Sequence, residues 1–363
     1  MRVTIILPGL RSTPAGGHKI QYEYAGCLAR RGHQVTVVQP MSPSSRLFTL
    51  SCLLRYAQVQ ARHRILGHRI LTWFTLDPRV KLLILPILRG SLLPRADVTV
   101  LTAWQTAVAT TNPARRAGRL VQVVYDYEFW VQADDETRAQ MRSALSRTDV
   151  ALLATSSVVK DMLTEMGLVP AGDVPAGIDL SQFYAENDGS ERSTVVGFAA
   201  RTGEAKGMAT MVNACKIIRS HRDDISFLSY GHELPAEVPD YVLHLGPLSP
   251  DRLREFYNAC LVFVLPSDHE GWGLPAVEAM ACGAALVTTA NGGAEDFAIH
   301  RVNALIVPPQ EPGALAAAIE QVVDDARLYR ELTHKALQKA KTLGIDDAVD
   351  RLEKVLIAVV SSK

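Results

Sequence analysis

The chain has 363 residues, of which 48% are hydrophobic and 21% are charged, a composition typical of a globular protein long enough for two domains. It contains no apolar run as long as a membrane span and no leader before the first strand-like run, so we expect a cytoplasmic protein. Five cysteines without a C-x-x-C pair favour reduced core thiols over a disulfide framework or a structural zinc site.

The net charge of zero conceals an uneven distribution. Residues 1–185 carry 21 Lys and Arg against 13 Asp and Glu, giving +8, whereas residues 186–363 carry 17 and 25, giving −8. This split fits two domains that face each other across a cleft, or a basic half that meets an anionic partner. An uneven surface charge without function explains it equally well.

The first half of the chain alternates short apolar runs with helical patterns. Strands are expected at residues 3–7, 34–38, 97–101, 120–125 and 149–154. This alternation predicts a Rossmann-like parallel sheet with helices between its strands.

Gly16 and Gly17 stand between the first strand and the first helix. Small residues at this place allow a phosphate or sugar to approach the helix start. An ordinary helix-capping turn explains them equally well, because the G-x-G-x-x-G fingerprint is absent. His18 follows the glycines and is either a contact to sugar or acceptor or a surface histidine at the helix start.

Residues 46–95 contain nine Lys and Arg, including Arg46, against a single acid, Asp77, with leucines and aromatic residues interleaved. One interpretation is a basic amphipathic surface that contacts anionic lipid or an acceptor carrying phosphate. The other is an ordinary helix and strand whose solvated arginines cover apolar area with their stems. A peripheral membrane contact through this region is therefore one of two hypotheses.

The strand at 120–125 runs into the sequence Y-D-Y-E-F-W, which places Asp126 and Glu128 at its carboxyl end. Ligands of open α/β sheets bind at the carboxyl ends of the strands. The two acids are therefore candidates for polar contacts to a ligand. Their spacing is equally compatible with ordinary acidic residues in a surface loop.

A second alternation begins after a polar stretch at 185–193, which suits a linker. Strands are expected at 194–199, 225–229, 242–245, 261–265, 285–287 and 302–307, and an amphipathic helix at 346–360 closes the chain. The sequence thus predicts an N-terminal domain of residues 1–185, a C-terminal domain of residues 186–345 and a terminal helical segment of residues 346–363.

Three glycine-bearing loops of the second half, at 201–207, 266–274 and 291–296, should share one edge of the sheet. Arg201 and Lys206 provide the cations that a diphosphate needs, and the carboxylates of Glu270 and Glu278 can accept hydrogen bonds from sugar hydroxyls. This combination favours a nucleotide-sugar over a bare nucleotide, and no G-x-x-x-x-G-K-[ST] pattern is present. A glycosidase acid/base pair formed by the two glutamates fits the helix start and the cations less well.

The run E-G-W-G-L-P-A-V-E at 270–278 resembles the E-x7-E motif of family-4 retaining glycosyltransferases. The resemblance covers nearly the whole chain and includes R-x4-K-G at 201–207, G-G-x-x-D at 292–296 and the A-G-G loop at 15–17. It implies the GT-B fold, with two Rossmann-like parallel-sheet domains facing across a cleft and the last helix crossing back onto the first domain.

The resemblance also implies roles for the site residues. Arg201 and Lys206 would bind the donor diphosphate and stabilise it as the leaving group, in place of a metal or other cofactor. Glu270 would contact the donor sugar and Glu278 the ribose. The remaining donor contacts would come from two loops: Gly16 and Gly17, and the backbone of Gly271, Trp272, Gly273 and Leu274.

The implied reaction is the transfer of a hexosyl or deoxyhexosyl group with retention, to a polysaccharide, glycolipid or natural-product acceptor and not to nucleic acid. Many family members carry a histidine near the strand end where this chain has Asp126 and Glu128. Asp126, Glu128 and His18 are therefore alternative acceptor-side residues, and Asp126 is grouped here with the catalytic candidates. An epimerase or phosphorylase of similar architecture, or a catalytically idle binding module, are the alternative functions.

Overall fold

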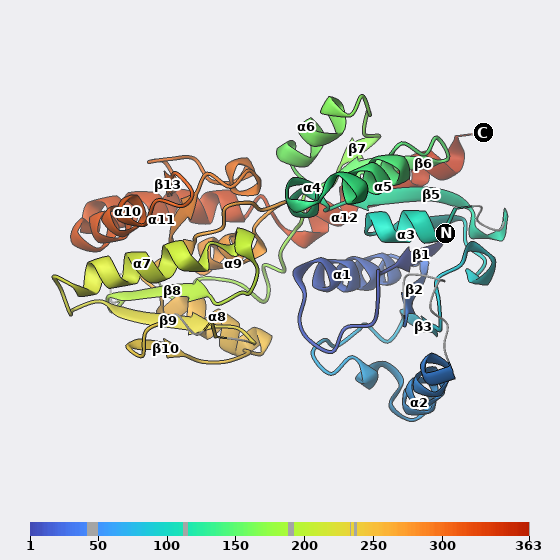
Figure 1. The fold of residues 1–363 in the computed structure, drawn as a ribbon, viewed down its shortest axis with the longest axis horizontal. Helices are drawn as coiled ribbons and strands as arrows, with labels where there is room; N and C mark the ends of the chain where they lie inside the picture. Colours follow the sequence, from blue (N-terminus) through green and yellow to red (C-terminus); the bar gives the residue numbers. More distant parts are fainter. Residues whose placement is uncertain (42–49, 112–114, 188–191, 233, 236–237, 363) are drawn as a thin grey trace. The chain divides into compact units, whose positions relative to one another are not determined.

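The computed structural model describes residues 1–41, 50–111, 115–187, 192–232, 234–235 and 238–362 (Figure 1). Arg46 and residues 188–191 of the expected linker lie outside the described residues, as does the side chain of Cys52. The chain divides into two compact units, one formed by Met1–Pro175 with Ile345–Lys363 and the other by Ala176–Gly344. Within the described ranges, no helix combines the length and the apolar character that a membrane span requires.

The first unit is built on a seven-stranded parallel sheet with the strand order β3-β2-β1-β4-β5-β6-β7. Its strands are β1 (Arg2–Ile6), β2 (Gln34–Pro40), β3 (Lys81–Leu85), β4 (Val98–Leu101), β5 (Arg119–Val124), β6 (Val150–Ala154) and β7 (Gly172–Asp173). Successive residues of the central strand β1, such as Val3, Thr4 and Ile5, are all buried. Because successive side chains point to opposite faces, both faces of this sheet are covered, as in other parallel sheets.

Helices connect the strands of the first unit (Figure 1). They are α1 (Gly16–Arg30), α2 (Leu50–Leu66), α3 (Trp104–Ala109), α4 (Tyr127–Gln132), α5 (Asp135–Leu145), α6 (Ser157–Glu165) and the C-terminal α12 (Ile345–Ser361). Helix α12 is joined to the end of α1 by Glu353, whose carboxylate lies 2.8 Å from Arg31 and 2.7 Å from His33. The last helix of the chain therefore completes the first unit.

The second unit contains a six-stranded parallel sheet with the order β10-β9-β8-β11-β12-β13. Its strands are β8 (Val195–Ala199), β9 (Ser226–Tyr230), β10 (Val242–His244), β11 (Val262–Leu265), β12 (Ala285–Thr289) and β13 (Ala304–Val307). Its helices are α7 (Met208–Arg219), α8 (Pro250–Ala259), α9 (Leu274–Ala281), α10 (Pro312–Asp324) and α11 (Ala326–Ala340). The predicted α/β class with two parallel sheets is confirmed.

Four cysteines with described side chains are buried free thiols: Cys27, Cys215, Cys260 and Cys282. Burial raises the pKa of each of them, to about 12 for Cys215 and Cys282. These four cysteines therefore act as small core residues, as the sequence predicts.

Candidate functional site

Three loops of the second unit follow the carboxyl ends of the neighbouring strands β8, β11 and β12. The first carries Arg201 and Lys206, the second Ser267 and Glu270, and the third begins at Asn291. Because the strands are parallel, the loops lie at the same edge of the sheet. The polar residues predicted from the separate motifs are thus placed side by side.

Arg201, Lys206 and Glu270 form one charge cluster. Arg201 Nη2 lies 2.7 Å from Glu270 Oε1, and Lys206 Nζ lies 3.5 Å from the same oxygen. The hydroxyl of Ser267 donates to that oxygen at 2.8 Å and accepts from Arg201 Nη2 at 3.0 Å. Two cations thus converge on one buried carboxylate, which leaves the cluster with a net charge of one positive unit.

The pKa of Glu270 is set by opposing effects. Its side chain is only 8% exposed, and burial alone would raise the pKa, since it penalises the charged form. The charges of Arg201 and Lys206, together with the hydrogen bonds from Ser267 and Arg201, outweigh burial and lower the pKa below its ordinary value. Glu270 is therefore ionised at neutral pH.

The backbone around Glu270 is fixed by the adjoining loop. Glu270 N–H donates to the carbonyl of Asn291 at 2.9 Å, and Gly293 N–H donates back to the carbonyl of Glu270 at 3.0 Å. A Cβ on Gly293 would lie 2.5 Å from the nitrogen of Trp272. A side chain at position 293 would therefore separate two loops that hold Glu270 in place.

Gly207, next to Lys206, likewise allows two loops to approach each other closely. Its φ is +65°, and an added Cβ would lie 1.8 Å from the carbonyl oxygen of Pro266. The neighbouring hydrogen bond from Asp268 N–H to the carbonyl of Ala205, at 2.8 Å, joins the same two loops. The close approach that brings Lys206 to Glu270 thus requires glycine at position 207.

Helix α9 begins at Leu274, as the sequence predicts, with Pro275 in its first turn. Gly273 precedes it with a φ of +104°, and no side chain caps the helix start. Trp272 is buried and packs against Phe297 at a ring-centroid distance of 5.6 Å. The indole is therefore buried in the turn, so a polar ligand contact from Gly271 to Leu274 would be made by the backbone.

Glu278 is 4% exposed and lies one turn into α9. Tyr257 of α8 donates its hydroxyl to Glu278 Oε2 at 3.0 Å, and the hydroxyls of Tyr230 and Tyr257 are 2.8 Å apart. Burial raises the pKa of both tyrosines, so both phenols are neutral and can donate. These two residues were not predicted from the sequence, although Tyr230 ends strand β9 at the edge that carries the site.

Gly16, Gly17 and His18 lie at the start of α1 in the first unit. A Cβ on Gly17 would meet no atom within 4 Å, so this loop has open space beside it. The interpretation of His18 as a surface residue is wrong: the side chain is buried, and its Nε2 lies 3.0 Å from the carbonyl oxygen of Gly9. Burial is the main cause that lowers the pKa of His18.

Asp126, between β5 and α4, is 3% exposed, so its interpretation as a surface-loop acid is wrong. The backbone N–H of Trp104 donates to its carboxyl group. Its Oδ2 is a buried oxygen without a hydrogen-bond partner among the described residues. Burial raises the pKa of Asp126 to about 7. Glu128 is half-buried in the first turn of α4.

The pKa of Asp126 predicts a pH dependence of stability. The unfolded chain releases this proton near pH 3.9, whereas the folded chain holds it up to about pH 7, so stability falls as pH rises through this window and levels off above it. The free energy of unfolding of Asp126→Asn, relative to that of wild type, should therefore rise by about 2–3 kcal/mol as the pH is raised from 5 to 8. Urea unfolding of both proteins across this range measures the difference, and a constant difference would contradict the raised pKa of this buried carboxyl group.

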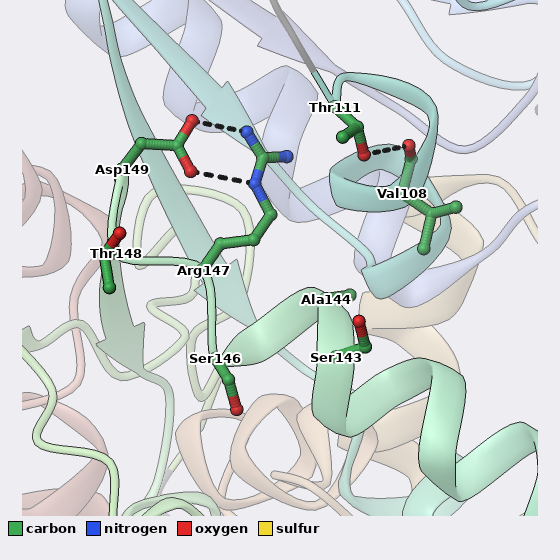
Figure 2. A pocket seen from close by; sticks show the side chains of 8 residues that line it. All are labelled: Val108, Thr111, Ser143, Ala144, Ser146, Arg147, Thr148 and Asp149. Carbon is green, nitrogen blue, oxygen red and sulfur yellow. Dashed lines mark hydrogen bonds and ion pairs between the residues drawn. The ribbon is translucent and has the colours of Figure 1, made fainter.

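A hollow of the first unit lies at the amino edge of its sheet, whereas Asp126 lies at the carboxyl edge (Figure 2). Figure 2 shows Arg147 facing Asp149, which immediately precedes β6, with the Nη2–Oδ2 distance 2.6 Å. Arg147 also donates to the carbonyl of Ala107 at 2.6 Å, near the end of α3. The charged groups of this hollow thus hold α3 against β6.

Over the described parts of the chain, no group of three or more His, Cys, Asp and Glu side chains is arranged to hold a metal ion.

A comparison with known protein families finds a match in the second unit, which contains the charge cluster. Residues 182–339 match the family model described as "Glycosyl transferases group 1". All members of the charge cluster, and Glu278, lie inside the matched region.

Curated relatives agree with this match. The chain is 31% identical over 192 residues to D-inositol 3-phosphate glycosyltransferase of Pseudarthrobacter chlorophenolicus, covering 47% of this chain and 46% of the relative. It is 27% identical over 214 residues to MMP alpha-(1->4)-mannosyltransferase of Mycolicibacterium hassiacum, covering 55% and 52%. The chain thus spans about half the length of the curated relatives it matches.

Solved structures extend the likeness beyond the matched residues 182–339. Sucrose-phosphate synthase of Thermosynechococcus elongatus superposes with a TM-score of 0.74 at 17% identity, covering 100% of both chains. HepE of Anabaena, in complex with UDP-glucose, superposes with a TM-score of 0.75 at 16% identity, covering 99% of this chain and 100% of HepE. The chain has the GT-B fold, which confirms the fold class predicted from the sequence.

Proposed function

We propose that this chain is a retaining glycosyltransferase that moves a hexosyl or deoxyhexosyl group from a nucleotide-diphosphate sugar to an acceptor. The observation that carries the proposal is the convergence of Arg201 and Lys206 on ionised Glu270 at the carboxyl edge of the second sheet. The curated relatives are named as glycosyltransferases and HepE was solved with UDP-glucose, which supports a nucleotide-sugar donor.

In the proposed reaction, the donor diphosphate binds Arg201 and Lys206. Arginine can form two parallel hydrogen bonds to phosphate oxygens, and lysine adds a point charge. Negative charge builds up on the diphosphate as the glycosidic bond breaks, so two preorganised cations stabilise the leaving group in the transition state. We propose that these cations take the place of a metal ion and that no cofactor takes part.

The two glutamates would bind different parts of the donor. Glu270, held in place by the loop that begins at Asn291, would accept hydrogen bonds from sugar hydroxyls. Glu278, oriented by the hydroxyl of Tyr257, would accept hydrogen bonds from the ribose. The backbone of the turn before α9 would complete the donor contacts.

We propose that the first unit supplies the acceptor side. Asp126 is our candidate for the polar contact to an acceptor or donor hydroxyl, because Oδ2 is buried and lacks a partner among the described residues. A carboxyl group whose pKa is about 7 can both donate and accept a proton near neutral pH. Gly16 and Gly17 would approach the diphosphate. The acceptor class, polysaccharide, glycolipid or natural product, and the cytoplasmic location are parts of the same proposal.

Tyr257→Phe tests the role of Glu278. The change removes the hydrogen bond to Glu278 Oε2 and is expected to raise the KM for the donor roughly tenfold, since hydrogen bonds to charged groups contribute about 1.5–3 kcal/mol. Because the ribose lies away from the reacting bond, kcat should change little. Steady-state kinetics measure both constants, and Tyr241→Phe, at a partly exposed tyrosine of the same unit, is the control. A fall in kcat at constant KM would contradict a ribose-binding role.

Incubation of the protein with a panel of nucleotide-sugars tests the function itself. We expect slow hydrolysis of one donor in the absence of acceptor, and NMR of the released sugar should show the anomeric configuration of the donor. An epimerised nucleotide-sugar would instead indicate an epimerase, and binding without turnover would indicate an idle binding module. Either result would overturn the proposal.

A further inference from the structure

Helix α2 presents apolar side chains to solvent. Ile65 is 82% exposed and Leu54 61% exposed, and Leu53 and Leu66 are also exposed. Positions 54 and 65 are eleven residues apart, close to three full turns, so their side chains lie on the same side of the helix. Figure 1 shows α2 beyond β3, the edge strand of the first sheet.

The opposite side of α2 is attached to that edge strand. The carbonyl of Ile84 in β3 accepts hydrogen bonds from the hydroxyl of Tyr56 at 3.4 Å and from Gln60 Nε2 at 2.9 Å. Positions 56 and 60 are one turn apart and share a helix face. These contacts fix the orientation of α2, and the side with Leu54 and Ile65 is the one directed away from the sheet.

The exposed face of α2 is also strongly basic. The exposed side chains of Arg62 and Arg64 lie on the two flanks of the stripe formed by Leu54 and Ile65, given 100° of rotation per residue. Arg55 is exposed on the same helix. No acidic residue occurs between residues 50 and 76, so the positive charge of this face has no compensation from its own segment.

We propose that α2 is a docking helix that lies on the surface of an anionic lipid bilayer. Leu54 and Ile65 would enter the boundary between headgroups and acyl chains, while the flanking arginines bind lipid phosphates and bury their stems. A second copy of this chain fits the face less well, because pairing two α2 helices would bring their arginines together. Charge complementarity thus selects a negatively charged lipid surface as the occupant.

The segment after α2 connects this surface to the start of α1. Trp73 Nε1 donates to the carbonyl of Arg11 at 3.0 Å, and the rings of Trp73 and Phe74 pack against Tyr22 at centroid distances of 5.7 and 4.9 Å. The segment after α2 thus contacts the loop that leads into Gly16. Under the proposed function, this proximity favours a glycolipid among the acceptor classes, whereas docking itself does not depend on that function.

Vesicle co-sedimentation tests the proposal without donor or acceptor, so its outcome is separate from that of the turnover assays. We expect the full chain to bind phosphatidylcholine vesicles that contain phosphatidylglycerol and not vesicles of phosphatidylcholine alone, with binding that weakens as salt rises. The double variant Arg62→Gln and Arg64→Gln should bind roughly 30-fold more weakly, at about 1 kcal/mol for each arginine. The double variant Leu54→Ser and Ile65→Ser should bind at least roughly tenfold more weakly.

Matched variants control for charge and apolar area elsewhere on the same unit. Arg351→Gln with Lys354→Gln removes two exposed positive charges from α12, and Val169→Ser removes a side chain that is 89% exposed. Both should bind like wild type, and circular dichroism should show every variant folded. Equal binding to the two kinds of vesicle, equal loss in the controls, or a dimer in sedimentation that Leu54→Ser with Ile65→Ser dissociates would overturn the proposal.

Discussion

Lys206→Ala is expected to lower the kcat of donor turnover by about two to three orders of magnitude. The change reduces the net charge of the cluster from one positive unit to zero, so the charge that develops on the leaving diphosphate loses part of its compensation. The fold should persist, because Glu270 keeps Arg201 at 2.7 Å and Ser267 at 2.8 Å. The buried carboxylate is therefore not left without a partner, which would cost several kcal/mol.

The control for Lys206→Ala is Lys216→Ala, which removes the same charge from an exposed position on α7. Steady-state kinetics with the donor identified by the panel should show wild-type kcat for the control. Thermal melting should show that both variants are folded. A Lys206→Ala protein that retains kcat within about twofold of wild type would show that this lysine does not stabilise the leaving group.

Gly207→Ala is expected to destabilise the second unit by more than about 4 kcal/mol. A left-handed φ costs an L-residue about 1–2 kcal/mol. The larger part arises because the new Cβ would lie 1.8 Å from the carbonyl of Pro266, and the loop that carries Lys206 must move to relieve the overlap. Donor turnover should fall with it, since the lysine is displaced from Glu270.

Gly246→Ala separates the two causes. Gly246 lies in the same unit with a φ of +68°, but an added Cβ would meet no atom within 4 Å. The free energy of unfolding of this variant should fall by only about 1–2 kcal/mol, the cost of the left-handed backbone conformation. Its activity should not change. Urea unfolding of the two variants measures the difference, and equal destabilisation would mean that the contact between the loops does not constrain position 207.

The strands and the edge that carries the site could be predicted from the sequence because parallel strands are continuous apolar runs. The run expected at 261–265 corresponds to β11 (Val262–Leu265), and the expected helix start at Leu274 is the first residue of α9. Glycine, proline and charged residues interrupt the pattern where each strand ends. These local signals were sufficient to bring Arg201 and Glu270 to one edge, although they are 69 positions apart.

Burial at the strand ends could not be predicted, because it depends on segments distant in sequence. Asp126 is covered where the start of α3 contributes the N–H of Trp104. His18 is buried where the loop at Gly9 folds over it. The residues after Asp126 form α4, a helix of six residues, which is too short for a periodic pattern to reveal.

The hydrogen-bond partners of the predicted acids could not be predicted from the sequence either. Tyr257 and Tyr230 come from α8 and β9, and nothing in their local sequence relates them to Glu278. For α2, composition alone left two interpretations open, because it does not tell which side of a helix faces the protein. The hydrogen bonds of Tyr56 and Gln60 to Ile84 decide the orientation.

Calorimetric titration measures directly whether Arg201 and Lys206 bind the donor diphosphate. The nucleoside diphosphate and monophosphate with the base of the identified donor would be titrated into wild type and Lys206→Ala. We predict that wild type binds the diphosphate at least tenfold more tightly than the monophosphate, because the second phosphate reaches both cations, a difference of about 1.4 kcal/mol. In Lys206→Ala this preference should largely disappear. An unchanged preference in the variant would show that the diphosphate binds elsewhere.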